Sequence, residues 1–229
     1  MVAELEQPCL CLVADCSVVS ADEMPGRVAA AIEGGVSMVQ LRAKEMPGGL
    51  MLSLAHELDR VIAGRAALLV NERVDVAATA GVSGVQLGEQ ALPAQAARRL
   101  LPSGSLVGRS VHSVEGALRA IADGADFLVV GTMFATISHP GEEPAGPALM
   151  KDTAARCSIP LVGIGGIVPD NVDAVVGAGA SGVAVIRSIL AADDPKSAAE
   201  QMRMALEESC QRRRGLLNNG VRPGTGRAT

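Results

Sequence analysis

The chain has 229 residues, of which 48% are hydrophobic, and it carries a formal net charge of −5. This length fits one large domain or two small ones, and the hydrophobic share is sufficient for a sizeable buried core. Trp and Tyr are absent, so only Phe127 and Phe134 could stack on nucleobases. Together with the negative charge, this argues against a nucleic-acid partner.

The first residues and the cysteines favour a cytoplasmic protein. Residues 1–6 lack the basic region of a signal peptide, and no apolar run approaches the length of a membrane span, so we expect no membrane partner. Five cysteines without framework spacing indicate reduced thiols. Cys9 and Cys11 share one face of an expected strand, which favours core packing over a metal site because two further ligands are missing. The sequence leaves the oligomeric state open, including a homo-oligomer.

Short apolar runs recur along the chain at intervals that leave room for a helix between them. Each run is almost continuously hydrophobic, as in parallel strands that are covered on both faces. The expected strands are Cys9–Ala14, Val36–Leu41, Ala67–Val70, Gly84–Leu87, Ser105–Gly108, Asp126–Val130, Pro160–Ile164 and Gly182–Ile186. The expected helices include Met24–Ile32, Leu50–Val61, Val74–Ala80, Leu92–Leu101, Val114–Ala122, Leu149–Cys157 and Asn171–Gly177.

These alternations predict an α/β fold, a single (β/α)8 TIM barrel over residues 1–210. A doubly wound open sheet is the structural rival, but it seldom carries eight evenly spaced units. Residues 211–229 contain three consecutive arginines and no acid. We expect a frayed helix end followed by a disordered basic tail, with phosphate or partner binding as the minor alternative.

Polar residues follow the second expected strand, where a closed barrel places its active site. Gln40, Arg42 and Lys44 alternate with other residues and therefore point the same way. Two cations at this spacing can clamp a phosphate or a pyrophosphate. The plainer alternative is a salt-bridged rim with Glu45 as the partner.

The next two strand ends also carry polar groups. Asn71 and Glu72 follow the third strand, where Asn71 could simply cap the following helix. Gln86 lies near the end of the fourth strand, and Glu89 is the only charged residue in the turn after it. These residues are candidate site residues if the barrel closes as expected.

Ser110 and His112 lie in the polar cluster 108–113, where the fifth strand ends and a helix should begin. Histidine can act as a general acid or base near neutral pH. The chain has only three histidines, and this one stands at a catalytic position of a barrel. We therefore expect His112 to take part in chemistry.

The last strand ends provide a loop and a phosphate cradle. The loop 131–141 is rich in hydroxyl groups and glycine, including Thr136 and Ser138, as expected of a lid over a phosphate. Gly165 and Gly166 follow the seventh strand. Their amides, with those near Ile186 and Arg187 after the eighth strand, would form the usual phosphate site of a barrel.

Several segments together resemble the thiamin-phosphate synthase/TenI family, over roughly Cys9 to Glu208. The matching pieces are 40–44, 70–77, 84–88, 108–113, 131–136 and 163–167. The resemblance implies an enzyme of thiamine biosynthesis that acts on a small phosphate ester, thiazole phosphate. It also implies one of two chemistries.

In the synthase branch, the family joins hydroxymethylpyrimidine pyrophosphate to thiazole phosphate with Mg²⁺. Two metal-binding aspartates of that branch fall on Glu72 and Ala91 of this chain. Ala91 cannot bind a metal, although Glu89 could substitute from two residues away. Magnesium matters in this reaction because the departing pyrophosphate must be neutralised. The lid positions of the synthase fall on Thr136, Ser138 and His139, and the last of these replaces a lysine.

The TenI branch resembles a thiazole tautomerase, which aromatises carboxythiazole phosphate by moving a proton and needs no metal cofactor. His112 aligns with the proton-shuttling histidine of that branch, and Ser110 and Thr136 would orient the ring or the carboxylate. The cluster 108–113 and Gln86 also look like this branch. We take the tautomerase as the first interpretation. A thiamine-phosphate synthase is the alternative, and a non-catalytic thiazole-phosphate-binding homologue is a third possibility.

Overall fold

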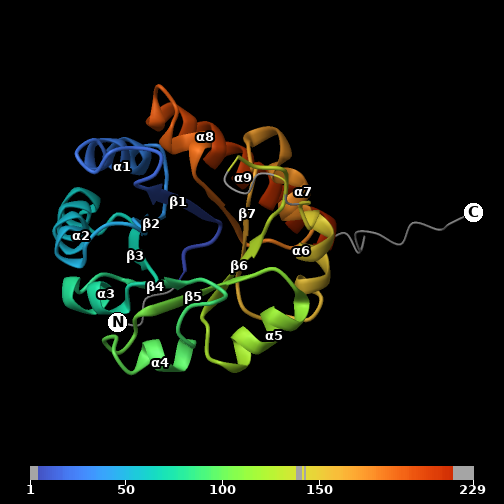
Figure 1. The fold of residues 1–229 in the computed structure, drawn as a ribbon. Helices are drawn as coiled ribbons and strands as arrows, with labels where there is room; N and C mark the ends of the chain where they lie inside the picture. The colour runs from blue at the N-terminus through green and yellow to red at the C-terminus, as the bar shows by residue number, and fades with distance from the viewer. Residues whose placement is uncertain (1–4, 138–140, 142, 219–229) are drawn as a thin grey trace, which may run out of the picture.

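The computed structural model describes residues 5–137, 141 and 143–218. Within this part of the chain, eight parallel strands close into a barrel in the order β1 to β8, surrounded by helices (Figure 1). The predicted (β/α)8 barrel is therefore confirmed. The strands are β1 (Cys9–Asp15), β2 (Met38–Arg42), β3 (Ala67–Asn71), β4 (Gly84–Leu87), β5 (Leu106–Val111), β6 (Phe127–Gly131), β7 (Leu161–Ile164) and β8 (Gly182–Val185).

The helices follow the strands in the expected order, with two additional ones near the C-terminal end of the described chain. They are α1 (Met24–Glu33), α2 (Gly48–Ile62), α3 (Val74–Ala80), α4 (Ala94–Arg98), α5 (Val114–Ala122), α6 (Gly146–Ala154), α7 (Val172–Gly177), α8 (Arg187–Leu190) and α9 (Pro195–Asn218), with the short 3-10 turn η1 (Pro169–Asn171) before α7. None of the described helices combines the length and apolarity that a bilayer crossing requires.

Side chains along each strand alternate between the barrel interior and the layer beneath the helices. In β1, Cys9, Cys11 and Val13 belong to the interior cluster, whereas Leu10 and Leu12 pack in the larger outer cluster. The two cysteines are thus core residues, as expected, and burial raises the pKa of the Cys9 thiol to about 12. Phe127 is the aromatic residue of the interior cluster, whose other members are small or aliphatic.

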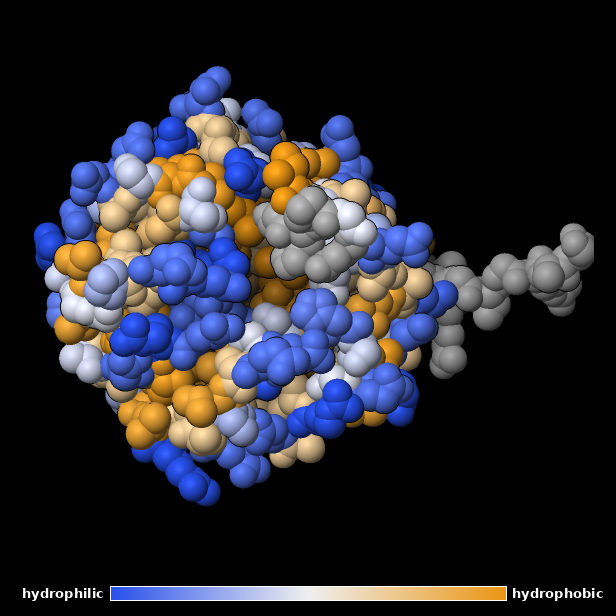
Figure 2. All heavy atoms as spheres, viewed as in Figure 1, coloured by the Kyte–Doolittle hydropathy of each residue, from blue (hydrophilic) through white to orange (hydrophobic). Residues whose placement is uncertain are grey.

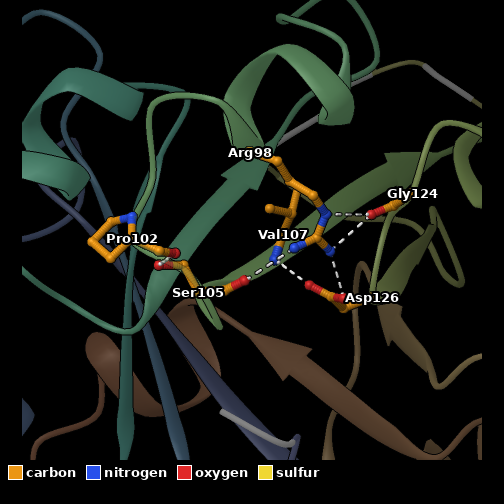
Figure 3. Close-up of polar contacts among 6 residues, drawn as sticks. All are labelled: Arg98, Pro102, Ser105, Val107, Gly124 and Asp126. Carbon is orange, nitrogen blue, oxygen red and sulfur yellow. Dashed lines mark hydrogen bonds and ion pairs between the residues drawn. The ribbon is translucent and has the colours of Figure 1, made fainter. Parts of the chain in front are cut away.

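The amino-terminal ends of β5 and β6 are joined by a polar network around Arg98, at the end of α4 (Figure 3). The guanidinium of Arg98 donates to the carbonyl oxygen of Gly124 at 2.9 and 3.0 Å and to Asp126 at 2.5 Å. Asp126 in turn accepts a 2.7 Å bond from the backbone N–H of Val107. This network ties one helix to the starts of two strands.

Helix α9 continues to Asn218, past the domain boundary expected at residue 210. The helix end expected at the start of this tail therefore extends over residues 211–218, while residues 219–229 lie outside the described chain. The reason is that the arginines have partners on the barrel. Arg212 pairs with Asp173 of α7 at 2.9 Å, and Arg213 donates to the carbonyl oxygen of Ala180 at 3.1 Å. The helix packs against α1 and α7.

The face of the molecule shown in Figure 2 is hollowed near its centre. Hydrophilic residues gather along one side of the hollow, and hydrophobic residues are visible within it. Such a depression in an otherwise packed barrel is where a small molecule can be partly enclosed.

Candidate active site

A polar layer closes the interior of the barrel at the carboxyl ends of β2 to β5. The amide of Gln40 donates to Asn71 Oδ1 at 2.8 Å, and the amide of Gln86 donates to Ser110 Oγ at 3.0 Å. Gln40 and Gln86 are 8% and 2% exposed. Gly108 provides the space for Gln86, because a Cβ at position 108 would lie 2.1 Å from Gln86 Oε1. The structure therefore brings four predicted site residues into one layer.

Arg42 lies at the end of β2, where its guanidinium forms an ion pair with Asp15 at the end of β1. Asp15 is 4% exposed and also accepts a 2.9 Å bond from the N–H of Ser17. The partner of Arg42 is thus Asp15 and not Glu45. Sequence reasoning missed Asp15, although it continues the inward positions of β1 by one further step. Lys44 lies beyond the strand and is exposed, with no ion pair recorded to another described residue.

Glu72 directly follows β3 and has a backbone φ of +61°, which is uncommon for a residue with a side chain. Its N–H donates to the carbonyl oxygen of Gln86 at 2.9 Å. Its carboxylate lies over Gly88, because a Cβ built there would be 2.4 Å from Glu72 Oε1. No described residue forms a recorded hydrogen bond or ion pair with this carboxylate.

The chemistry of this carboxylate fits one ligand of a magnesium ion. Mg²⁺ prefers oxygen ligands and is usually held by one or two carboxylates together with substrate phosphates. The described residues contain no group of three or more His, Cys, Asp or Glu side chains that could hold a metal. An ion at Glu72 would therefore need oxygen ligands from a bound phosphate or pyrophosphate.

His112 follows β5 directly, and its Nδ1 lies 2.8 Å from Glu89 Oε2. Both side chains lie on the rim, with exposed fractions of 55% and 40%. Arg109, on the outer side of β5, donates to the backbone oxygens of Glu89 at 3.0 Å and Leu92 at 2.6 Å. The structure thus gives Glu89, the second candidate metal ligand, a histidine as its partner.

The loops after β6 and β7 are bonded to each other. The N–H of Met133 donates to Ile164 O at 2.8 Å, and the N–H of Phe134 donates to Gly165 O at 3.0 Å. Gly166 has a φ of +61°, and a Cβ there would lie 2.5 Å from Ala135 O. Only glycine, which has no Cβ, can lie this close to the carbonyl oxygen of Ala135. Thr136 is half-buried on the same loop, whereas Ser138 and His139 lie outside the described residues.

The backbone amides at the ends of β7 and β8 are the ones that the sequence predicts for an anion site. Among the described loop hydrogen bonds, none uses the N–H groups of Gly165, Gly166, Arg187 or Ser188 as a donor. Ile186 precedes the short helix α8, and Arg187 is its first residue and is exposed. These amides are therefore available to a phosphate group.

Comparisons with known proteins agree with this architecture. A family model described as thiamine monophosphate synthase (TMP-TENI) matches residues 10–189. The thiamine-phosphate synthase of Methanoculleus marisnigri is 45% identical over 179 residues, which cover 77% of this chain and 84% of that protein. That of Anaeromyxobacter dehalogenans is 43% identical over 78% of this chain and 81% of its own length.

Solved structures extend the agreement to three dimensions. The thiamine phosphate pyrophosphorylase from Pyrococcus furiosus superimposes with a TM-score of 0.79 at 32% identity, covering 88% of this chain and 96% of that one. The BexX/CysO complex from Amycolatopsis orientalis matches with a TM-score of 0.66 at 18% identity, covering 98% and 96% of the two chains, which shows the shared fold alone. The family model and the relatives above 40% identity decide the assignment: this chain belongs to the thiamine monophosphate synthase/TenI family.

Proposed function

We propose that this chain is a thiamine-phosphate synthase, which couples hydroxymethylpyrimidine pyrophosphate to thiazole phosphate. The observation that carries the proposal is the set of relatives named thiamine-phosphate synthase, which are 43–45% identical over more than three quarters of the chain. These relatives favour the synthase, the alternative interpretation of the sequence, over the tautomerase. The cations and the carboxylate at the ends of β2 and β3 support the same choice.

The two phosphate-bearing substrates would bind at opposite sides of the rim. Arg42 and Lys44 would bind the pyrophosphate, with Asp15 holding the Arg42 guanidinium in place. The amides of Gly165, Gly166 and Arg187 would bind the thiazole phosphate. This arrangement would hold the two rings over the polar layer between the two anion sites, which converts a bimolecular reaction into a positioned one.

Glu72 would hold Mg²⁺ together with the pyrophosphate oxygens. When bound there, the ion supplies positive charge that stabilises the departing pyrophosphate. The residues of the polar layer would orient the rings. Gln86 and Ser110 are suited to this task, because a hydrogen bond and burial restrict the Gln86 side chain.

A second candidate function is the tautomerase, and it rests on His112. The histidine stands at the end of β5 with a carboxylate on one ring nitrogen, a pairing that can support proton transfer. A tautomerase would use the same phosphate cradle but would not depend on Lys44, Glu72 or a divalent ion.

The deciding experiment is product formation by the purified chain from both substrates, with Mg²⁺ and with EDTA. A synthase gives thiamin phosphate only with the metal, and Glu72→Gln lowers the rate at least about 100-fold because the substitution removes the carboxylate charge that holds the ion. The matched control is Glu57→Gln, an exposed glutamate on α2, which should leave the rate unchanged. Proton exchange on carboxythiazole phosphate without coupling would establish the tautomerase. Binding without either reaction would establish the non-catalytic homologue.

A further inference from the structure

We propose that Glu89 is a positioning residue that sets the tautomer of His112, and that it is not a second magnesium ligand. The proposal concerns a pair of residues on the rim between β4 and β5. Its part concerning magnesium rests on the proposed synthase function, whereas its part concerning the histidine does not.

The hydrogen bond between the two side chains decides which ring nitrogen carries the proton. His112 Nδ1 lies 2.8 Å from Glu89 Oε2, and an ionised carboxylate can only accept a hydrogen bond. Nδ1 is therefore protonated in the neutral ring. Nε2 is left as the nitrogen with a free lone pair, which can accept a hydrogen bond or a proton.

The backbone of the Glu89 turn is fixed to the strand that leads into His112. Arg109 donates one bond to the backbone oxygen of Glu89 and another to that of Leu92. A cavity of about 330 Å³ lies beneath this turn, between β5 and α5, and is lined by Glu89, Arg109 and Gly116 among others. The two bonds from Arg109 therefore help to hold the turn in place, together with the bond from the N–H of Ala91 to the carbonyl oxygen of Gly88.

Both carboxylate oxygens of Glu89 face the β5–α5 side of the rim. Oε2 is bonded to His112, and Oε1 lies 3.4 Å from a Cβ built at Gly116, in the first turn of α5. The Glu72 carboxylate lies instead over Gly88. Since Ala91 has no donor atom, Glu72 is the protein carboxylate left for the metal at this part of the rim.

The first test is nitrogen NMR of ¹⁵N-histidine-labelled full-length protein at about pH 8.5, above the ordinary imidazole pKa. The His112 signals are assigned with His112→Gln. We expect the Nδ1–H tautomer in the wild type and a mixture in Glu89→Gln and Arg109→Met. The matched control is Glu115→Gln, an exposed glutamate in the first turn of α5, which should keep the wild-type tautomer. An unchanged tautomer in Glu89→Gln would overturn the positioning role.

The second test is calorimetric titration of Mg²⁺ into the protein with inorganic pyrophosphate present. We expect Glu72→Gln to weaken Mg²⁺ binding at least 10-fold and Glu89→Gln to change it less than twofold. An equal loss in Glu89→Gln would show that Glu89 also binds the ion and would overturn its exclusion as a magnesium ligand. Failure of the proposed function has a different signature: no thiamin phosphate would form, while the tautomer change in Glu89→Gln would persist.

Discussion

The two ends of the barrel use polar side chains in opposite ways. At the amino-terminal end, Arg98 and Asp126 bind each other and then terminate on backbone groups of Gly124 and Val107 (Figure 3). At the carboxyl end, side chains pair with side chains across neighbouring strands. Those pairs are Asp15 with Arg42, Gln40 with Asn71, Gln86 with Ser110, and Glu89 with His112.

This difference separates stability from function. A network that ends on backbone atoms has used its donors and acceptors to fix the chain. At the carboxyl end, Glu72 and the amides of Gly165 and Gly166 have no recorded partner in the described part of the chain. The comparison therefore predicts that substitutions at one end lower stability and that those at the other end lower activity.

The largest loss of stability is expected between the two ends, at Gly108. A Cβ there would lie 2.1 Å from Gln86 Oε1 and 2.3 Å from Phe127 Cζ, and both side chains are buried. Gly108→Ala should lower the free energy of unfolding by about 3 kcal/mol, measured by urea denaturation. Gly49→Ala is the control, since nothing lies within 4 Å of the added atom and the residue is helical; it should be stabilising by about 0.5 kcal/mol. A neutral Gly108→Ala would show that the polar layer is loosely packed.

The next largest loss of stability is expected in the amino-terminal network of Arg98 and Asp126. Asp126→Ala removes the acceptor of the buried Val107 N–H and should lower the free energy of unfolding by about 2 kcal/mol. The specific activity of the folded protein should not change. Arg98→Ala should cost less, about 1 kcal/mol, because the side chains of this ion pair are each more than one third exposed. If either variant lost activity while its free energy of unfolding stayed unchanged, the amino-terminal end would take part in function and the proposed separation of stability from activity would be wrong.

A smaller loss of stability, joined to a loss of activity, is expected at Ser110. Ser110→Ala removes the acceptor of the Gln86 amide, which should cost about 1 kcal/mol of stability. We also expect kcat/KM to fall about 10-fold, because a freed Gln86 side chain no longer orients the substrate. Urea denaturation and steady-state kinetics, both measured on one preparation of Ser110→Ala, test the two expected effects. An unchanged kcat/KM would remove Ser110 from the site.

Local patterns predicted the barrel because each strand is a separate apolar run of the right length. They also placed His112 correctly, since a polar cluster after a strand marks its carboxyl end. What the patterns could not give is the choice of partner. Asp15 meets Arg42 through the neighbouring strands β1 and β2, and Glu89 reaches His112 through a turn held by Arg109. The helical state of residues 211–218 likewise depends on contacts with α7 that no local pattern contains.

The smallest expected effect concerns the reactivity of the cysteines in the barrel interior, which lies between the two ends. Cys9 and Cys11 are buried, and desolvation raises the pKa of both thiols, that of Cys9 to about 12. In the folded protein at pH 8, a thiol reagent should therefore react with Cys16, Cys157 and Cys210 and reach the buried pair only after unfolding.

The raised pKa of these thiols also affects the free energy of unfolding. Between about pH 9 and 12 these thiols ionise in the unfolded chain but not in the folded one, so stability should fall as the pH rises through that range, and Cys9→Ala should reduce the slope. Rapid labelling of Cys9 at pH 8 would mean that the interior opens, and the two ends would then be coupled through it.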